Sequence, residues 1–221
     1  MQRAQGRGDA RRALVLIGAA LLVGYGCARA TIDRLPSPDG VTAPETFRVA
    51  FETTKGTFIA EAHRAWSPAA VDRFYDLVRR SYYDSVPIHR VVPGFVAQFG
   101  LTGDSAVDTA WRGHGVPDEP TVVSNTAGRI AFARGGPASR VTQLYVNLAD
   151  NPRLDTLATS GITGYPPIAE VVEGMDVVLS FEGRHANATL PFQDSLRLRG
   201  TAWLDARFPG LDYILRASLV R

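Results

Sequence analysis

The sequence predicts a mainly β fold. Short runs rich in β-branched and aromatic residues recur along the chain, and turn signals such as Thr54-Lys55-Gly56 and Pro93-Gly94 separate them. Only one longer segment, which begins at Ser67, carries apolar residues at helical spacing. The 221 residues suffice for one sizeable domain, and an apolar content of 45% is ordinary for a globular protein.

The expected elements follow a simple order. Two alternating runs open the domain as a β-hairpin, and a helix follows with Ser67 as N-cap and Pro68 at its first position. Two further strands then meet at the tight turn of Pro93-Gly94. The predicted strands span 47–53, 56–62, 86–92, 95–100, 128–133, 143–148, 168–171 and 215–220. A short helix is expected directly after the strand 168–171.

Two stretches lack a clear pattern. Residues 101–125 are rich in glycine and acidic residues, and a loop of this length is usually functional or mobile. Residues 181–209 form an extension of the same fold, with a loop at 184–192 and weak alternation at 195–204. Three large side chains in and just after this extension are expected to pack over an outer surface: Trp203, Phe208 and Leu211.

The charge balance does not indicate a nucleic-acid partner. The net charge is +2, from 24 basic and 22 acidic residues. Four arginines and one aspartate lie within residues 1–26, so the remainder of the chain is close to neutral. The basic character therefore belongs mainly to the first segment of the chain.

Residues 1–26 have the layout of a secretory signal peptide: arginines, then the apolar run 13–26, then small residues. The run is short for a membrane-spanning helix, which needs about 20 residues. Gly26-Cys27 resembles the end of a bacterial lipobox, whereas Ala28-Arg29-Ala30 offers an alternative cleavage site. We therefore expect export to the periplasm or cell envelope, with Cys27 as a lipidation site or removed. Residues 27–46 are predicted to be a linker, and 47–221 the folded domain.

The segment His89–Gln98, H-R-V-V-P-G-F-V-A-Q, combines a fixed cation (Arg90), an aromatic ring (Phe95) and a neutral amide (Gln98). These groups suit holding an uncharged polar chain segment better than breaking a bond. The segment closely resembles the core motif of the cyclophilins, the peptidyl-prolyl cis/trans isomerases, F-H-R-x-x-P-G-F-x-x-Q-G-G-D. Here Ile88 takes the place of the leading Phe, and Phe99 replaces the first Gly of the closing pair.

A second signature supports the first. G-R-I-A-F-A-R-G-G-P-A-S-R-V-T-Q-L-Y-V resembles the cyclophilin pattern G-x-L-x-M-A-[NR] … G-S-Q-F-F-I, and the spacing from Gly128 to Gln143 fits without insertion. The resemblance covers about residues 47–179 and the final strand. It implies a closed eight-stranded antiparallel barrel, capped by two helices, with the active groove on its outer face. It also implies no cofactor, and we expect a monomer.

The resemblance implies catalysis by Arg90, Phe95 and Gln98 at X-Pro bonds of cell-envelope proteins. The family's substrate-binding positions fall on Val96, Ala133, Arg134, Gln143, Tyr145, Leu154 and, in a lengthened loop at 155–167, Tyr165. Tyr145 stands where the family has a pocket Phe, so its added hydroxyl needs a hydrogen-bond partner. The histidines show no metal-ligand spacing, and no metal site is expected. His89 is interpreted as structural.

The chemistry requires no bond to be cleaved. A peptide bond before proline exchanges slowly because resonance sets a barrier of about 18–20 kcal/mol. A catalyst need only favour the twisted state, in which the prolyl nitrogen accepts a hydrogen bond. Arg90 suits that task, since a guanidinium is always charged and offers five donors. Two alternatives remain: a non-catalytic peptide-binding or chaperone module, suggested by departures at Leu144, Arg153 and the loop 155–167, and a structural envelope lipoprotein.

Overall fold

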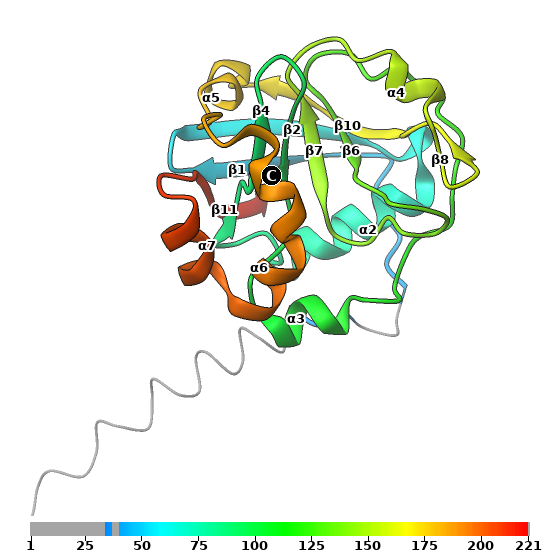
Figure 1. Ribbon diagram of the computed structural model, residues 1–221. Helices are drawn as coiled ribbons and strands as arrows, with labels where there is room; N and C mark the ends of the chain where they lie inside the picture. Colours follow the sequence, from blue (N-terminus) through cyan, green and yellow to red (C-terminus); the bar gives the residue numbers. More distant parts are fainter. Residues whose placement is uncertain (1–33, 37–39, 221) are drawn as a thin grey trace, which may run out of the picture. The chain divides into compact units, whose positions relative to one another are not determined.

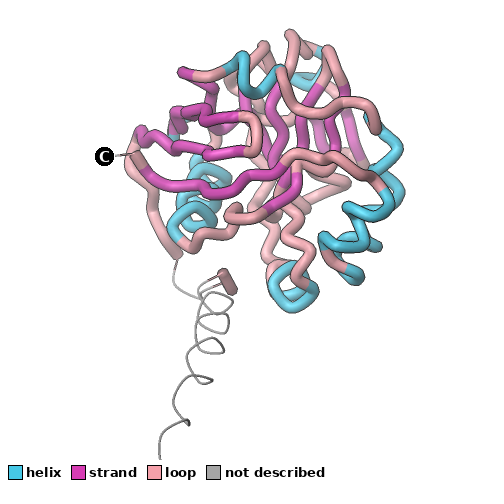
Figure 2. Tube along the Cα trace, turned by 90° about the vertical axis from the view of Figure 1, so that its left-hand side faces the viewer, coloured by secondary structure: helices cyan, strands magenta, loops and turns pink. Residues whose placement is uncertain are grey.

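A computed structural model describes residues 34–36 and 40–220. The predicted signal peptide and Cys27 lie outside these described residues. The strands curl around a central core, and most helices lie at the outside (Figures 1 and 2). The strands of the main sheet are β1 (Thr46–Thr53), β2 (Gly56–His63), β3 (Val86–Pro87), β4 (Arg90–Val92), β5 (Val96–Phe99), β6 (Arg129–Phe132), β7 (Leu144–Asn147), β10 (Pro167–Glu173) and β11 (Tyr213–Leu219).

The sheet is curled but open, so the prediction of a closed eight-stranded barrel is wrong. It has nine strands in the order β3-β11-β1-β2-β10-β6-β7-β5-β4. The predicted strand 86–92 divides at Ile88-His89, where the amide of Ile88 donates to the carbonyl of Asp212 at 2.8 Å. β3 pairs with β11 and β4 pairs with β5, so no ladder joins the two edge strands. In the chain, Ile88 and His89 lie between these two strands.

The main core lies inside the curl of the sheet and is dominated by aromatic rings. Phe51 of β1 and Phe58 of β2 are buried and stack with ring centroids 4.8 Å apart. Helix α2 (Pro68–Arg79) covers this part of the sheet and places Phe74 6.3 Å from Phe51. The apolar face that the helical spacing predicts is therefore the face that packs on the sheet.

The start of α2 is stabilised differently from the prediction. Ser67 precedes the helix and Pro68 opens it, but the Ser67 hydroxyl makes no capping bond to the backbone. It donates instead to the carboxylate of Glu119, which also accepts the amides of Ala69 at 2.8 Å and Ala70 at 3.3 Å. A carboxylate from the loop 101–125 thus satisfies free amides at the helix N-terminus, where negative charge is favourable.

The remaining short elements lie in the segments that connect the strands of the main sheet. Helix α3 (Ser105–Ala110) lies within the predicted loop, and its N-cap is Asp104, whose carboxylate accepts the amide N–H of Ala106 at 2.9 Å. Helix α5 (Met175–Leu179) follows β10, as expected. Helix α4 (Arg153–Thr156) and a small hairpin, β8 (Ala158–Thr159) and β9 (Ile162–Thr163), build the lengthened loop. Among the described residues, no helix has the length and apolar content needed to cross a membrane.

The extension 181–209 is helical, and the weak alternation at 195–204 was misleading. It forms a 3₁₀ segment η2 (Ala186–Phe192) and two helices, α6 (Gln193–Arg199) and α7 (Thr201–Arg207). Gly200 separates the helices with a φ of 81°, a conformation that glycine adopts without strain. The extension has its own small apolar cluster, in which Trp203 and Phe192 pack against Leu101, Leu196, Leu204, Phe208 and Leu211. The three side chains predicted to pack over an outer surface all belong to it.

Candidate active site

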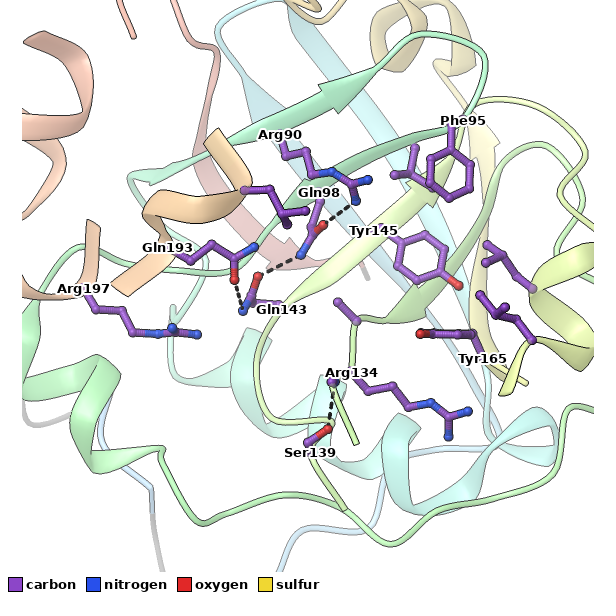
Figure 3. A pocket seen from close by; sticks show the side chains of 16 residues that line it. Arg90, Phe95, Gln98, Arg134, Ser139, Gln143, Tyr145, Tyr165, Gln193 and Arg197 are labelled. Carbon is purple, nitrogen blue, oxygen red and sulfur yellow. Dashed lines mark hydrogen bonds between the residues drawn. The ribbon is translucent and has the colours of Figure 1, made fainter. Parts of the chain in front are cut away.

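The structure gathers the predicted site residues around one cavity of about 500 Å³ (Figure 3). All ten predicted catalytic and binding positions line it: Arg90, Phe95, Val96, Gln98, Ala133, Arg134, Gln143, Tyr145, Leu154 and Tyr165. They come from β4, β5 and the turn between them, from the segment after β6, from β7 and the residue before it, and from the lengthened loop with α4. Their individual roles remain predictions.

Strand alternation explains why these residues meet. In β5, Ala97 and Phe99 point into the main core, whereas Val96 and Gln98 face the cavity. In β7, Tyr145 likewise faces the cavity between two core residues. Because successive side chains of a strand point to opposite faces, adjacent strands place a second row of residues on the outer face. The cavity therefore lies on the face opposite the main core.

The Arg90 guanidinium is held by neutral amide oxygens. Its Nη1 donates to Gln98 Oε1 at 2.9 Å, and its Nε donates to Asn187 Oδ1 at 2.9 Å. Within the described part of the chain, no carboxylate lies within salt-bridge distance of it. Burial lowers the pKa of Arg90 from its usual value, but an arginine remains charged in proteins. The cation therefore keeps its full charge beside the cavity.

A row of amides continues from Arg90 across the sheet. Gln98 Nε2 donates to Gln143 Oε1 at 2.9 Å, and Gln143 Nε2 donates to Gln193 Oε1 at 3.3 Å (Figure 3). Gln98 and Gln143 each use the oxygen to accept and the nitrogen to donate, which fixes the orientation of both amides. The row therefore orients Gln98 so that its oxygen faces the cation.

An apolar slot lies next to this polar row. The Phe95 ring forms one side, with the guanidinium carbons of Arg90 and Arg153 5.7 Å and 4.6 Å from its centroid. Tyr145 is buried, and its hydroxyl donates to Asn125 Oδ1 at 3.0 Å, which supplies the partner that its position requires. Burial raises the pKa of Tyr145 well above its usual value, so the hydroxyl stays neutral. Val96 and Leu154 complete the slot.

Arg134 lines the cavity, but its charge is engaged within the protein. Its Nη1 lies 3.3 Å from Asp118 Oδ1, its Nη2 donates to the carbonyl of Ile162 at 3.0 Å, and its guanidinium lies over the Tyr165 ring at 4.7 Å. The Tyr165 hydroxyl in turn lies 2.9 Å from Thr159 Oγ1. Arg134 therefore anchors the lengthened loop. Arg197 pairs with Asp194 at 2.7 Å, so within residues 34–36 and 40–220 Arg90 is the cavity cation that no carboxylate neutralises.

Sequence reasoning missed six residues that line the cavity: Gly135, Ser139, Leu157, Leu190, Gln193 and Arg197. Leu190, Gln193 and Arg197 belong to η2 and α6 of the extension, which carries no recognisable motif. Leu157 belongs to the lengthened loop. Only Gly135 and Ser139 lie inside the second signature, between the predicted positions Arg134 and Gln143, and this placement could have identified them. In the part of the chain that the structure describes, no group of three His, Cys, Asp or Glu side chains could hold a metal ion.

The site is suited to binding an extended peptide. The apolar slot can take a small ring of that peptide, and the Arg90 guanidinium can contact the amide group next to the ring. Comparison with known proteins gives the family. Residues 48–199 match the model of the cyclophilin type peptidyl-prolyl cis-trans isomerase/CLD family, and the chain belongs to this family of isomerases.

Individual relatives agree with this assignment. The chain is 33% identical over 140 residues to peptidyl-prolyl cis-trans isomerase B of Escherichia coli, an alignment covering 61% of this chain and 84% of the relative. It is 35% identical over 113 residues to peptidyl-prolyl cis-trans isomerase-like 1 of Gibberella zeae, covering 50% of this chain and 70% of the relative.

Solved structures show the same fold at lower identity. A cyclophilin type peptidyl-prolyl cis-trans isomerase of Cryptosporidium parvum superposes with a TM-score of 0.56 at 16% identity, over 80% of this chain and 98% of that one. A cyclophilin of Hirschia baltica also gives a TM-score of 0.56, at 17% identity, over 80% of this chain and 74% of that one.

Proposed function

We propose that this cavity is the isomerase active site, with Arg90 as the catalytic group, and that its substrates are X-Pro bonds of cell-envelope proteins whose folding it assists. The observation that carries the proposal is the arrangement around Arg90. Its guanidinium is half-buried, bound only to neutral amide oxygens among the described residues, and adjacent to the slot of Phe95 and Tyr145.

The proposed mechanism rests on preferential binding of the twisted amide. The prolyl ring enters the apolar slot, and the preceding peptide group lies beside Arg90. When the C–N bond twists, its double-bond character is lost and the nitrogen lone pair becomes an acceptor for a guanidinium N–H. A donor that is positioned in advance stabilises this state more than either planar isomer, because the planar amide nitrogen has no free lone pair.

The cell-envelope substrates follow from the expected leader. The arginines and apolar run of residues 1–26 support export, and Gly26-Cys27 supports a lipid anchor. The intact mass of the mature protein, purified from membranes of a bacterial host, tests this part. A chain that begins with diacylglycerol-modified Cys27 supports the anchor, a chain that begins at Thr31 supports export without it, and a full-length chain contradicts export.

A protease-coupled assay on a proline peptide tests the active site. We expect Arg90→Ala to lower kcat/KM by about 100-fold or more, the range seen when one preorganised donor to a transition state is removed. Arg199→Ala, which removes an exposed arginine of α6 outside the cavity, serves as the matched control and should keep wild-type activity. Equal rates for wild type and Arg90→Ala would contradict the proposal. If both were negligible, the non-catalytic peptide-binding module would remain.

A further inference from the structure

The extension lines the cavity and also contacts the cation of the proposed active site through a residue outside the cavity lining. Segment η2 packs directly on β4, the strand that carries Arg90. Asn187 of η2 does not line the cavity, yet its side-chain oxygen accepts the Arg90 Nε–H at 2.9 Å. The contact joins residues 97 positions apart in the chain. It is therefore a product of how the extension is folded.

The start of the extension is fixed against the sheet. At Gly183 the chain crosses so close to the Pro93 ring that a Cβ would lie 2.7 Å from Pro93 Cγ, so only glycine fits there. His185 Nε2 lies 3.0 Å from the carbonyl oxygen of Pro209, and its ring packs edge-on against Phe208 with centroids 5.4 Å apart. These contacts precede Asn187 by two to four residues and limit where its side chain can lie.

The hydrogen bonds to Asn187 and Gln98 use two different N–H donors of Arg90. Asn187 takes the Nε–H from one side and Gln98 takes one Nη1–H from the other, which holds the planar guanidinium at two points. Arg90 has five N–H donors, so three remain for a peptide in the cavity. Both acceptors are neutral. A carboxylate at either position would orient the guanidinium equally well but would offset its charge.

We propose that Asn187 is a positioning residue for Arg90, which holds the guanidinium toward the bound amide without neutralising it. This inference rests on the proposed role of Arg90. Asn187 does not touch the substrate, so its effect falls on the rate of the isomerisation step and not on substrate binding. The extension is then part of the catalytic apparatus of this chain.

Two substitutions separate this role from a merely structural one. Asn187→Ala removes the acceptor, and we expect kcat to fall about fivefold with KM within about twofold, as for loss of one hydrogen bond to a charged group at an exposed position. Asn187→Asp keeps an acceptor but adds a carboxylate. We expect kcat to fall further, on the order of tenfold, while the melting temperature stays at or above that of the wild type. Ala188→Ser, at the exposed neighbouring position, is the control.

The outcomes are distinct. If Asn187→Asp is as active as the wild type, or more active than Asn187→Ala, the contact only attaches η2 to the sheet and the inference is wrong. Unchanged kcat in both variants overturns it as well. Arg90→Ala, measured in the same assay, separates the two proposals. If Arg90→Ala is inactive while both Asn187 variants are unaffected, only the positioning role fails; if Arg90→Ala is fully active, the proposed active site fails with it.

Discussion

The two walls of the cavity are built on different supports. The sheet wall (Arg90, Gln98, Gln143 and Tyr145) lies on strands whose alternate residues fill the main core. The extension wall (Leu190, Gln193 and Arg197) lies on a 3₁₀ segment and a seven-residue helix that cover a separate small cluster. Gln98 and Tyr145 are buried, whereas Leu190 is 45% exposed. The residues of the proposed chemistry therefore lie on the better-buried sheet wall, and the proposed positioning residue Asn187 comes from the less-buried extension.

The largest expected difference is in stability. Phe51→Ala removes a ring from the centre of the main core and should lower the free energy of unfolding by about 3–5 kcal/mol. Leu204→Ala in the extension cluster should cost about 2–3 kcal/mol, because fewer neighbours surround the resulting cavity. Urea unfolding of both variants provides the measurement. A cost for Leu204→Ala equal to that for Phe51→Ala would mean that the two cores are one unit.

The free energy of unfolding should decrease in acid because of the buried side chain of His89. His89 is buried between β3 and β4, and burial, with the charges of Arg197 and Arg90, lowers its pKa to about 3. The unfolded chain takes up this proton near the usual value of 6.5, and the folded protein only near 3. Below pH 6.5, stability should therefore fall by about 1.4 kcal/mol per pH unit from this group, until about pH 3.

Urea unfolding at pH 7, 6 and 5 checks this prediction. His89→Gln has no titrating ring, so the same series should show a slope shallower by the contribution of His89. Identical slopes in the two proteins would mean that His89 takes up its proton in the folded state near its usual pKa.

A smaller effect is expected for the hydroxyl of Tyr145. Tyr145→Phe keeps the ring of the slot but removes the donor to Asn125, whose Oδ1 still accepts from Asn147 Nδ2 at 3.2 Å. We expect a loss of about 1 kcal/mol in stability and nearly unchanged kcat. Thermal unfolding and the isomerase assay measure the two quantities. A large loss of kcat with intact stability would give the hydroxyl a direct role in the reaction.

The smallest effect is expected on the extension wall. Leu190 is half-exposed at the rim of the cavity, so Leu190→Ala should leave stability within about 0.5 kcal/mol. Loss of its contact with a bound peptide should raise KM about threefold at constant kcat. Steady-state kinetics on a proline peptide with large apolar flanking residues provides the test. A change in kcat instead would show that this rim takes part in the isomerisation step.

The sheet wall was predictable because its signals are local. The run from His89 to Gln98 fixes a turn and two short strands, and period-2 alternation then decides which side chains leave the core. The second signature supplies β6 and β7 with the correct spacing. The eight predicted positions within these two signatures consequently meet at one cavity, which Leu154 and Tyr165 also line.

The closure of the sheet was not predictable from the same signals. An apolar run such as 86–92 reads as one strand, but whether it pairs throughout depends on partners far away in the chain. Here Ile88 bonds to Asp212, and the ladder changes partner between β3 and β4.

The extension wall was not predictable either. Helices α6 and α7 span seven residues each, which is too short for a periodic pattern to distinguish them from a strand. The contact between Asn187 and Arg90 has no local signature, because it depends on the close passage at Gly183 and on the packing of His185 against Phe208.

The central claim is that Arg90 favours the twisted amide over both planar isomers. Exchange NMR on a proline peptide at saturating enzyme measures the on-enzyme cis–trans interconversion rate, and a titration of the same sample measures Kd. For Arg90→Ala we predict an interconversion rate lower by about 100-fold with Kd changed by less than about threefold. A rate that stays at the wild-type value, or that falls only as far as binding weakens, would contradict the account.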